Sequence, residues 1–172
     1  MTFSEGNLKL EIPDALSGRK VDGAGHGLSH CMRAVDFVVN LADRYLFIEL
    51  KDPQHPRATS RARQTFIARL HSGELDEELR HKYRDSFLYE WAAGRADKPI
   101  DYLVLIALDT LDDAQLAHRK TSLERQLPAW GPQGRRWARP LVRLCAVFNL
   151  ESWNRNLPKY PVRRVALPGR GG

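Results

Sequence analysis

The segment from residue 34 to residue 53, AVDFVVNLADRYLFIELKDP, constrains the fold more than any other part of the chain. Two runs of strand-forming residues flank a short polar turn, a pattern that predicts a β-hairpin with mostly buried side chains. Three charged residues, Asp36, Glu49 and Lys51, nevertheless lie inside these runs. Any fold of this chain must therefore place two carboxylates and an ammonium group in or beside a buried sheet.

The turn fixes how these charges meet. With the turn centred between Ala42 and Asp43, Asp36 faces Glu49 across the hairpin, and Lys51 lies further along on the same side. Directly opposed residues have Cβ atoms about 4.5 to 5.5 Å apart. The other face is wholly apolar and pairs Val35 with Leu50, Phe37 with Ile48, and Val39 with Leu46. The hairpin is therefore predicted to bury one apolar face and to bring two carboxylates together on the other.

Two opposed carboxylates repel each other unless positive charge lies between them. A hard divalent cation fits this position, because Mg²⁺ takes oxygen ligands and uses one or two protein carboxylates together with water and phosphate oxygens. Lys51, beside such an ion, would hold or help to deprotonate an attacking water and would stabilise charge that develops on a phosphate. The alternative is structural: Lys51 forms an ordinary salt bridge with Asp36 or Glu49, and no metal binds.

The spacing of these residues resembles a known motif. Asp36, twelve intervening residues, and then Glu49, Leu50 and Lys51 resemble the D…ExK motif of the PD-(D/E)XK nuclease superfamily, which has the restriction-endonuclease-like fold. The resemblance implies that Asp36, Glu49 and the backbone carbonyl of Leu50 bind Mg²⁺ or Mn²⁺ and that Lys51 is the catalytic lysine. It also implies hydrolysis of phosphodiester bonds in nucleic acid, with DNA favoured, and leaves a homodimer open.

Three further residues are supplementary candidates. Members of the superfamily often add a glutamate from an N-terminal helix, for which Glu5 is a candidate, although it lies just before a predicted strand and not on a helix. Gln64 lies on the helix predicted after the motif, where some families place another site residue. His55 follows the predicted catalytic strand. A solvated helix residue and an ordinary polar loop are the alternative interpretations of Gln64 and His55.

The remaining elements predict an α/β fold with a single mixed β-sheet, helices on both faces and the restriction-endonuclease-like arrangement. Residues 14–33 are expected to be loop, and Leu75, Leu79, Tyr83, Phe87 and Trp91 to form a core-facing helical stripe. Strands are predicted at residues 8–12, 100–108, 141–150 and 160–167, and helices within 58–93, with a break near 71–75, at 112–127 and at 151–158. Residues 1–168 are expected to form one domain, with a disordered tail at 169–172.

Composition and charge indicate where the protein is located and what kind of partner it binds. The chain has 172 residues, of which 42% are hydrophobic, and neither a leader nor a membrane span is recognisable, so a cytoplasmic protein is expected. Residues 114–172 hold 12 Lys and Arg against 2 Asp and Glu, a balance that favours a polyanionic partner such as nucleic acid. In that segment Arg135, Arg136 and Arg139 lie near Trp130 and Trp137, a mixture suited to phosphate contact and base stacking.

Three functional hypotheses remain open from the sequence. The first is a Mg²⁺-dependent nuclease that uses Asp36, Glu49 and Lys51. The second is a catalytically weak or inactive protein that keeps the nuclease fold and acts as a nucleic-acid-binding or interaction module. The third is a structural α/β protein in which the charges of the hairpin form salt bridges and the basic segment is a solvated surface.

Overall fold

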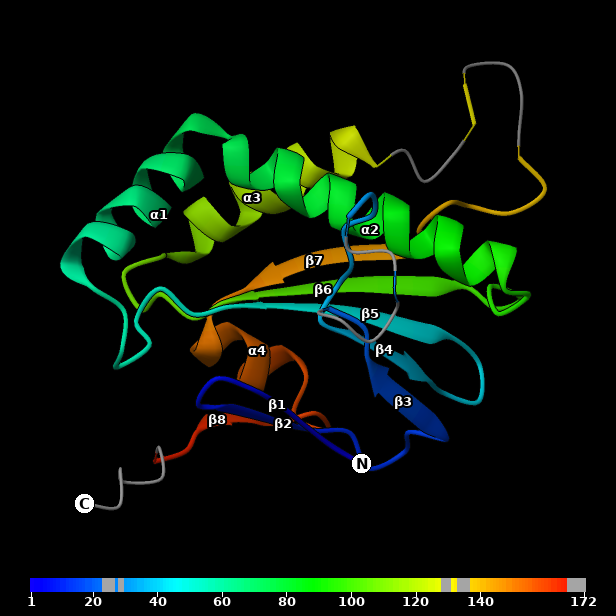
Figure 1. Ribbon diagram of the computed structural model, residues 1–172, viewed down its shortest axis with the longest axis horizontal. Helices are drawn as coiled ribbons and strands as arrows, with labels where there is room; N and C mark the ends of the chain where they lie inside the picture. Colours follow the sequence, from blue (N-terminus) through cyan, green and yellow to red (C-terminus); the bar gives the residue numbers. More distant parts are fainter. Residues whose placement is uncertain (23–26, 28–29, 128–130, 133–136, 167–172) are drawn as a thin grey trace.

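The computed structural model describes residues 1–22, 27, 30–127, 131–132 and 137–166. The described chain forms two sheets and four helices (Figure 1). The strands are β1 (Thr2–Glu5), β2 (Leu8–Glu11), β3 (Ser17–Lys20), β4 (Phe37–Asn40), β5 (Tyr45–Lys51), β6 (Ile100–Ile106), β7 (Leu144–Phe148) and β8 (Val162–Arg164). The helices are α1 (Ser60–Ser72), α2 (Glu74–Ala92), α3 (Asp113–Gln126) and α4 (Leu150–Asn156).

The larger sheet has the strand order β3-β4-β5-β6-β7 and is mixed. Strands β3, β4 and β5 pair antiparallel, whereas β5, β6 and β7 pair parallel. Helices α1, α2 and α3 cover one face, and α4 with the smaller sheet covers the other (Figure 1). Every residue of β6 is buried, which confirms the prediction that this apolar run lies in the middle of a sheet.

The predicted register of the hairpin is confirmed over β4, but Val35, predicted to pair with Leu50 on the apolar face, packs in the core on the side of α1, α2 and α3. Asn40 lies opposite Tyr45 and Val38 lies opposite Phe47, so the turn is centred where the sequence indicates. Continuing this register places Asp36, one residue before β4, at the level of Glu49. Apolar residues Phe37, Val39, Leu46 and Ile48 pack toward α4 and the smaller sheet, so the charged residues lie on the side of α1, α2 and α3.

The prediction of a single sheet is wrong. Strand β2 does not join the hairpin but pairs with β1 on one side and with β8 on the other, forming an antiparallel sheet of its own. Its Leu8 and Leu10 are fully buried in the core beneath the larger sheet, together with Val162 of β8. The sheet of β1, β2 and β8 therefore covers, together with α4, a face of the larger sheet that the sequence pattern assigns only to helices.

The expectation of loop at residues 14–33 also fails in part, because β3 forms at Ser17–Lys20. This strand has no apolar side chain, so no alternating pattern marks it in the sequence. It is held by backbone pairing with β4 and by a close approach at Gly18, where a Cβ would lie 2.4 Å from the ring of Phe3. A Cβ at this position would displace the Phe3 ring, because the two sheets approach each other closely there.

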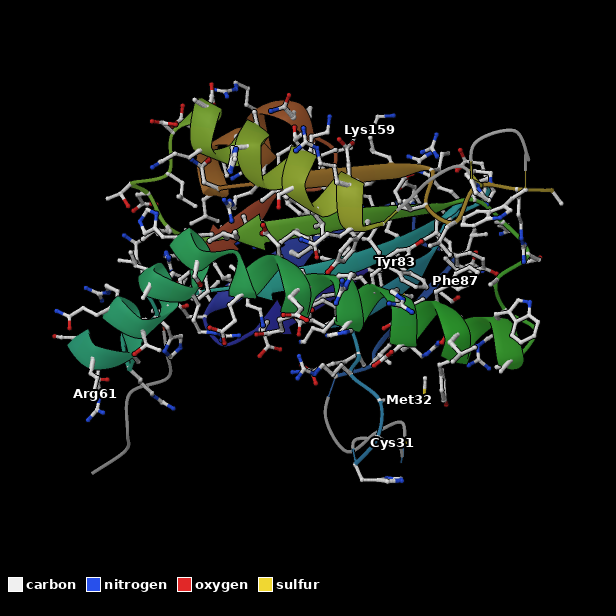
Figure 2. All side chains as sticks on the ribbon, turned by 90° about the horizontal axis from the view of Figure 1, so that it is seen from above. Cys31, Met32, Arg61, Tyr83, Phe87 and Lys159 are labelled. Atoms are coloured by element: carbon white, nitrogen blue, oxygen red, sulfur yellow. The ribbon has the colours of Figure 1, made fainter. Side chains whose placement is uncertain are left out.

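The helical predictions are largely confirmed. Gly73 has φ of 83° and separates α1 from α2 at the predicted break, and the Asp112 side chain caps α3 by accepting from the Gln115 N–H at 2.7 Å. Tyr83 is fully buried and Phe87 partly buried along α2 (Figure 2). Trp91, however, is 58% exposed, so the predicted core-facing stripe ends one turn earlier. No helix among the described residues is long and apolar enough to cross a membrane.

The packing of α2 generates a matched test. Leu79 is 1% exposed and Leu88 is 51% exposed on the same helix, so a Leu→Ala substitution can be compared at a buried and at an exposed position. We expect Leu79→Ala to lower the free energy of unfolding by about 2 to 5 kcal/mol, because it leaves a cavity in the core. Leu88→Ala should change it by no more than about 0.5 kcal/mol. Urea denaturation of both variants measures the difference, and equal losses would contradict this packing.

Candidate active site

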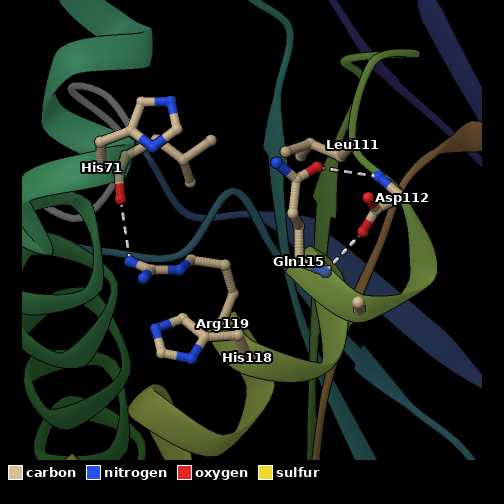
Figure 3. A pocket seen from close by; sticks show the side chains of 8 residues that line it. His71, Leu111, Asp112, Gln115, His118 and Arg119 are labelled. Carbon is tan, nitrogen blue, oxygen red and sulfur yellow. Dashed lines mark hydrogen bonds between the residues drawn. The ribbon is translucent and has the colours of Figure 1, made fainter.

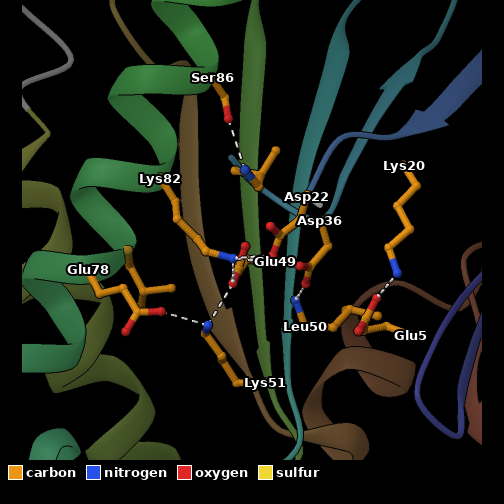
Figure 4. A network of polar contacts seen from close by, with 12 residues as sticks. Glu5, Lys20, Asp22, Asp36, Glu49, Leu50, Lys51, Glu78, Lys82 and Ser86 are labelled. Atoms are coloured by element: carbon orange, nitrogen blue, oxygen red, sulfur yellow. Dashed lines mark hydrogen bonds and ion pairs between the residues drawn. The ribbon is translucent and has the colours of Figure 1, made fainter. Parts of the chain in front are cut away.

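A row of polar side chains on α2 faces the carboxylates of the hairpin. Glu78, Lys82, Ser86 and Glu90 are spaced four residues apart and therefore share one side of the helix. Glu78 accepts from Lys51 Nζ at 2.8 Å, and Ser86 Oγ accepts from the Val35 N–H at 2.9 Å (Figure 4). At the end of the row, Glu90 binds Arg19 of β3. The row thus connects α2 to β3, to β5 and to the segment just before β4.

Asp36 and Glu49 are buried beneath this row. Asp36 is 4% exposed and Glu49 has no exposed surface. Oδ2 of Asp36 accepts from the backbone N–H of Leu50 at 2.6 Å, which joins the start of β4 to β5. Oε1 of Glu49 forms ion pairs with Lys51 at 2.9 Å and with Lys82 at 2.8 Å. The structure therefore brings Asp36, Glu49 and Lys51 together, as the hairpin register predicts.

Lys82 is the residue that the sequence analysis misses. Its ammonium lies 2.8 Å from Oε1 of Glu49 and 3.7 Å from Oδ1 of Asp36, so positive charge from α2 lies beside both carboxylates. The side chain also pairs with Asp22 at 2.9 Å (Figure 4). The available signal is the four-residue spacing of Glu78, Lys82 and Ser86, which runs alongside the apolar row of α2.

The site has more negative groups than positive ones. Among the described residues, the four carboxylates of Asp22, Asp36, Glu49 and Glu78 contact two lysines, Lys51 and Lys82, and Arg69 also pairs with Glu78. Burial and the charge of Glu49 raise the pKa of Asp36 to about 8, although the charge of Lys82 acts in the opposite direction. Asp36 therefore keeps its proton near neutral pH when no further cation is present.

The lysines and Glu78 are held in their charged forms. Burial lowers the pKa of Lys82, but the charges of Glu49 and Asp36 raise it by more, so the net shift is upward. The pKa of Lys51 is also raised, because Glu49 and Glu78 outweigh the effects of burial and of Lys82. Burial raises the pKa of Glu78, but Lys51 and Arg69 lower it to about 2. The ammonium of Lys51 is therefore a permanent positive charge at neutral pH.

The donor set fits a hard divalent cation. Oε2 of Glu49 is buried and has no hydrogen-bond partner among the described residues, so one carboxylate oxygen is free to accept a ligand bond. The Leu50 N–H points toward Asp36. In a strand the N–H and the carbonyl of one residue point to the same side, so the Leu50 carbonyl also faces this site. No cluster of three or more His, Cys, Asp or Glu side chains within the described ranges is arranged to hold a metal. Two carboxylates and a carbonyl suit Mg²⁺, which retains several waters.

The three supplementary candidates differ in how close they lie to the buried carboxylates. Glu5 binds Lys20 at 2.6 Å, and its charge contributes to the raised pKa of Asp36, so β1 places it beside the site (Figure 4). His55 packs against Gly6, the residue after Glu5, where a Cβ would lie 3.1 Å from the imidazole ring. Gln64 lies at an exposed position of α1. Only Glu5 is thus linked electrostatically to the buried carboxylates.

Of the three predicted nucleic-acid-binding arginines, the structure describes only Arg139, and it does not lie at this site. Arg135 and Arg136 lie outside the described residues, as does the tail predicted at 169–172. Arg139 binds the carbonyl of Ala96, before β6 begins, whereas Lys51 lies opposite Ile106 at the end of that strand. Ile106 lies six residue steps along β6 from Ile100, so Arg139 lies about 20 Å from Lys51 along the sheet. The arginine therefore belongs to a different part of the surface.

Part of the basic C-terminal segment is engaged within the fold. Five of its arginines pair with acids from the first 113 residues of the chain, so the charge asymmetry of the sequence is partly cancelled in space. The pairs are Arg119 with Asp76, Arg143 with Asp101, Arg155 with Asp113, Arg163 with Glu11, and Arg164 with Asp52. Charge balance along the sequence therefore overstates the basic surface that is free for a partner.

A separate cavity of about 460 Å³ lies between the end of α1 and the start of α3 (Figure 3). His71, Gln115, His118 and Arg119 line it, and none of the buried carboxylates of the hairpin does. The guanidinium of Arg119 is already bound, to the Leu70 carbonyl at 2.8 Å and to Asp76 at 2.9 Å. The cavity is therefore separate from the buried carboxylates of the hairpin.

Comparison with known proteins gives no relative for this chain. No family model, no curated protein and no solved structure matches it. Its assignment therefore rests on the geometry of the site.

The raised pKa of Asp36 predicts how stability depends on pH. A group that holds its proton more tightly in the folded state stabilises that state at low pH and loses this contribution as pH rises through the folded pKa. For Asp36 the window runs from 3.8, the usual value, to about 8. We expect the free energy of unfolding of metal-free protein to fall across this window and Asp36→Asn to reduce the slope.

Urea denaturation at several pH values in EDTA measures this slope. Asp43→Asn is the matched control, because Asp43 lies in the turn of the same hairpin with 67% of its side chain exposed. This control should keep the slope of wild type. If Asp36→Asn and Asp43→Asn behave alike, Asp36 is not the group that holds the proton.

Proposed function

We propose that this protein is a divalent-metal-dependent nuclease with the restriction-endonuclease-like fold. The observation that carries the proposal is the burial of Asp36 and Glu49 side by side, in a cluster where four carboxylates contact two lysines among the described residues. The order of elements, with a hairpin followed by helices, a parallel strand, a helix and another parallel strand, supports the fold assignment. Mg²⁺ or Mn²⁺ is the proposed cofactor.

Asp36, Glu49 and the carbonyl of Leu50 would hold the cation. A divalent ion there supplies a Lewis acid for a phosphate oxygen and lowers the pKa of a bound water. The fully buried Glu49 fixes one carboxylate rigidly, because its strand is covered on both faces. Asp36 is oriented by the N–H of Leu50, so the two ligands keep a constant separation. The site is thus preorganised by the hairpin itself.

Lys51 acts through its positive charge. Its pKa is raised, so it is a poor base, and its ammonium is held between Glu49 at 2.9 Å and Glu78 at 2.8 Å. A fixed cation beside the site stabilises negative charge that develops on the phosphate during hydrolysis and orients the attacking water. Of the two roles open to this lysine, charge stabilisation is therefore the one that its surroundings support.

The substrate class follows from the chemistry of the site and from the basic balance of the chain. A net charge of +6 favours approach of a polyanion, and DNA is preferred over RNA only on the resemblance of the D…ExK spacing. Arg139 beside the exposed Trp137 offers phosphate contact and base stacking at the other end of the sheet. Homodimerisation stays a prediction of the resemblance.

One observation favours a second candidate, a catalytically inactive protein of the same fold that binds nucleic acid or a partner. The ammonium of Lys82 already lies beside both carboxylates. If that ion pair is permanent, no metal binds and the site is structural. The two candidates differ in whether divalent cations bind at Asp36.

Cleavage of plasmid and single-stranded DNA in Mg²⁺ tests the first candidate. We expect Asp36→Asn and Glu49→Gln to abolish cleavage, because each removes a metal ligand, and EDTA to abolish it in wild type. Lys51→Gln should lower the rate by about 10² to 10³-fold, because one charge that stabilises the transition state is lost. Asp43→Asn, in the exposed turn, should cleave like wild type. Cleavage that survives Asp36→Asn would assign the activity to another site or to a contaminant.

A further inference from the structure

We propose that the Lys82 ammonium and a divalent cation compete for the same position between Asp36 and Glu49, so that Lys82 sets the metal affinity of the site. This inference rests on the proposed function, because it concerns the same two carboxylates. It adds a residue from α2 that the D…ExK spacing does not contain. It also predicts that the ion pair between Lys82 and Glu49 opens when the metal binds.

The competition follows from the contacts of the ammonium. Lys82 Nζ lies 2.8 Å from Glu49 and 3.7 Å from Asp36, which are the two side chains proposed to hold the metal. Mg²⁺ binds oxygen ligands at about 2.0 to 2.1 Å, so a cation shared by these carboxylates occupies the volume that the ammonium now fills. Two cations cannot share that volume in a site with little exposed surface.

The structure provides a place for the displaced ammonium. Lys82 also contacts Asp22 at 2.9 Å, and that carboxylate is 46% exposed. A lysine side chain has several rotatable bonds, so rotation toward Asp22 keeps the ammonium paired while Glu49 becomes free. The buried Oε2 of Glu49, which has no partner among the described residues, then has room for a ligand bond. Release therefore leaves no charge buried and alone.

Three proteins test the competition by calorimetric titration with Mn²⁺: wild type, Lys82→Gln and Lys20→Gln. We expect Lys82→Gln to bind Mn²⁺ at least about tenfold more tightly. At the dielectric values of a protein, the repulsion between Mn²⁺ and a positive charge a few ångström away exceeds the free energy of a tenfold change in affinity. Lys20→Gln removes the same charge from a residue that contacts Glu5 instead of Glu49. It should change the affinity by less than about threefold, since this charge is exposed and screened.

The possible outcomes separate the two proposals. Tighter binding by Lys82→Gln alone supports the competition. If wild type binds no Mn²⁺ while Lys82→Gln does, the competition stands and the proposed nuclease function fails. Equal affinities of wild type and Lys82→Gln overturn the competition and leave the nuclease proposal intact. Binding to neither protein overturns both, and equal tightening by Lys20→Gln assigns the effect to net charge and overturns the role of Lys82.

A measurement on wild type covers the case in which Lys82→Gln does not fold. In protein labelled with ¹⁵N at lysine, the buried Lys82 ammonium should give a resolved signal, because its protons exchange slowly with water. We expect this signal to shift or broaden as Mg²⁺ is added, while the signal of Lys98, whose part-buried ammonium donates to Asn40 and to the Leu41 carbonyl, stays in place. If calorimetry detects Mg²⁺ binding and the Lys82 signal does not change, the ion pair persists in the metal-bound protein and the inference is wrong.

Discussion

Glu49 has no exposed surface, and a charged carboxylate in such a position is stable only beside positive charge. The surroundings of β5 meet this requirement from two directions. Lys51 reaches Glu49 along the strand, and Lys82 reaches it from α2. The position of α2 over the sheet is thus tied to a single buried charge. The same requirement explains why Lys82, a residue type that is seldom buried, is only 8% exposed.

Helix α2 combines two rows of residues with different tasks. Leu75, Leu79 and Tyr83 form the apolar row and pack in the core with β6. The neighbouring polar row contacts β5 and the segment just before β4, and at its far end Glu90 binds Arg19 of β3. Both rows repeat every fourth residue on the same helix, so the orientation that buries the apolar row also directs the polar row toward the hairpin. The fold and the site therefore depend on the same helix orientation.

The sequence predicts those parts of the fold that local pattern controls. The hairpin register, the buried strand β6 and the break at Gly73 all follow from alternation, apolar runs or glycine. Strand β3 could not be predicted, because Ser17–Lys20 has no apolar residue and gains its order from pairing with β4. The second sheet was missed because it joins the two ends of the chain, and pairing over such a distance leaves no local signal.

Only the hairpin residues of the candidate site could be predicted from the sequence. Asp36, Glu49 and Lys51 are brought together by one hairpin, so their spacing and the turn are sufficient. Lys82 comes from a helix whose placement over the hairpin depends on tertiary packing, and its sequence neighbourhood resembles any charged helix face. The exposure of Trp91 has the same origin, because α2 extends past the edge of the core that its earlier residues cover.

The central claim is that a divalent cation binds between Asp36 and Glu49, and diffraction from crystals grown with Mn²⁺ tests it most directly. Anomalous scattering from manganese locates the ion independently of the protein atoms. The account predicts one strong peak within ligand distance of both carboxylates, with the Lys82 ammonium moved toward Asp22. The absence of any peak at these carboxylates, with Lys82 still bound to Glu49 in saturating Mn²⁺, would contradict it and would identify the site as a buried ion pair.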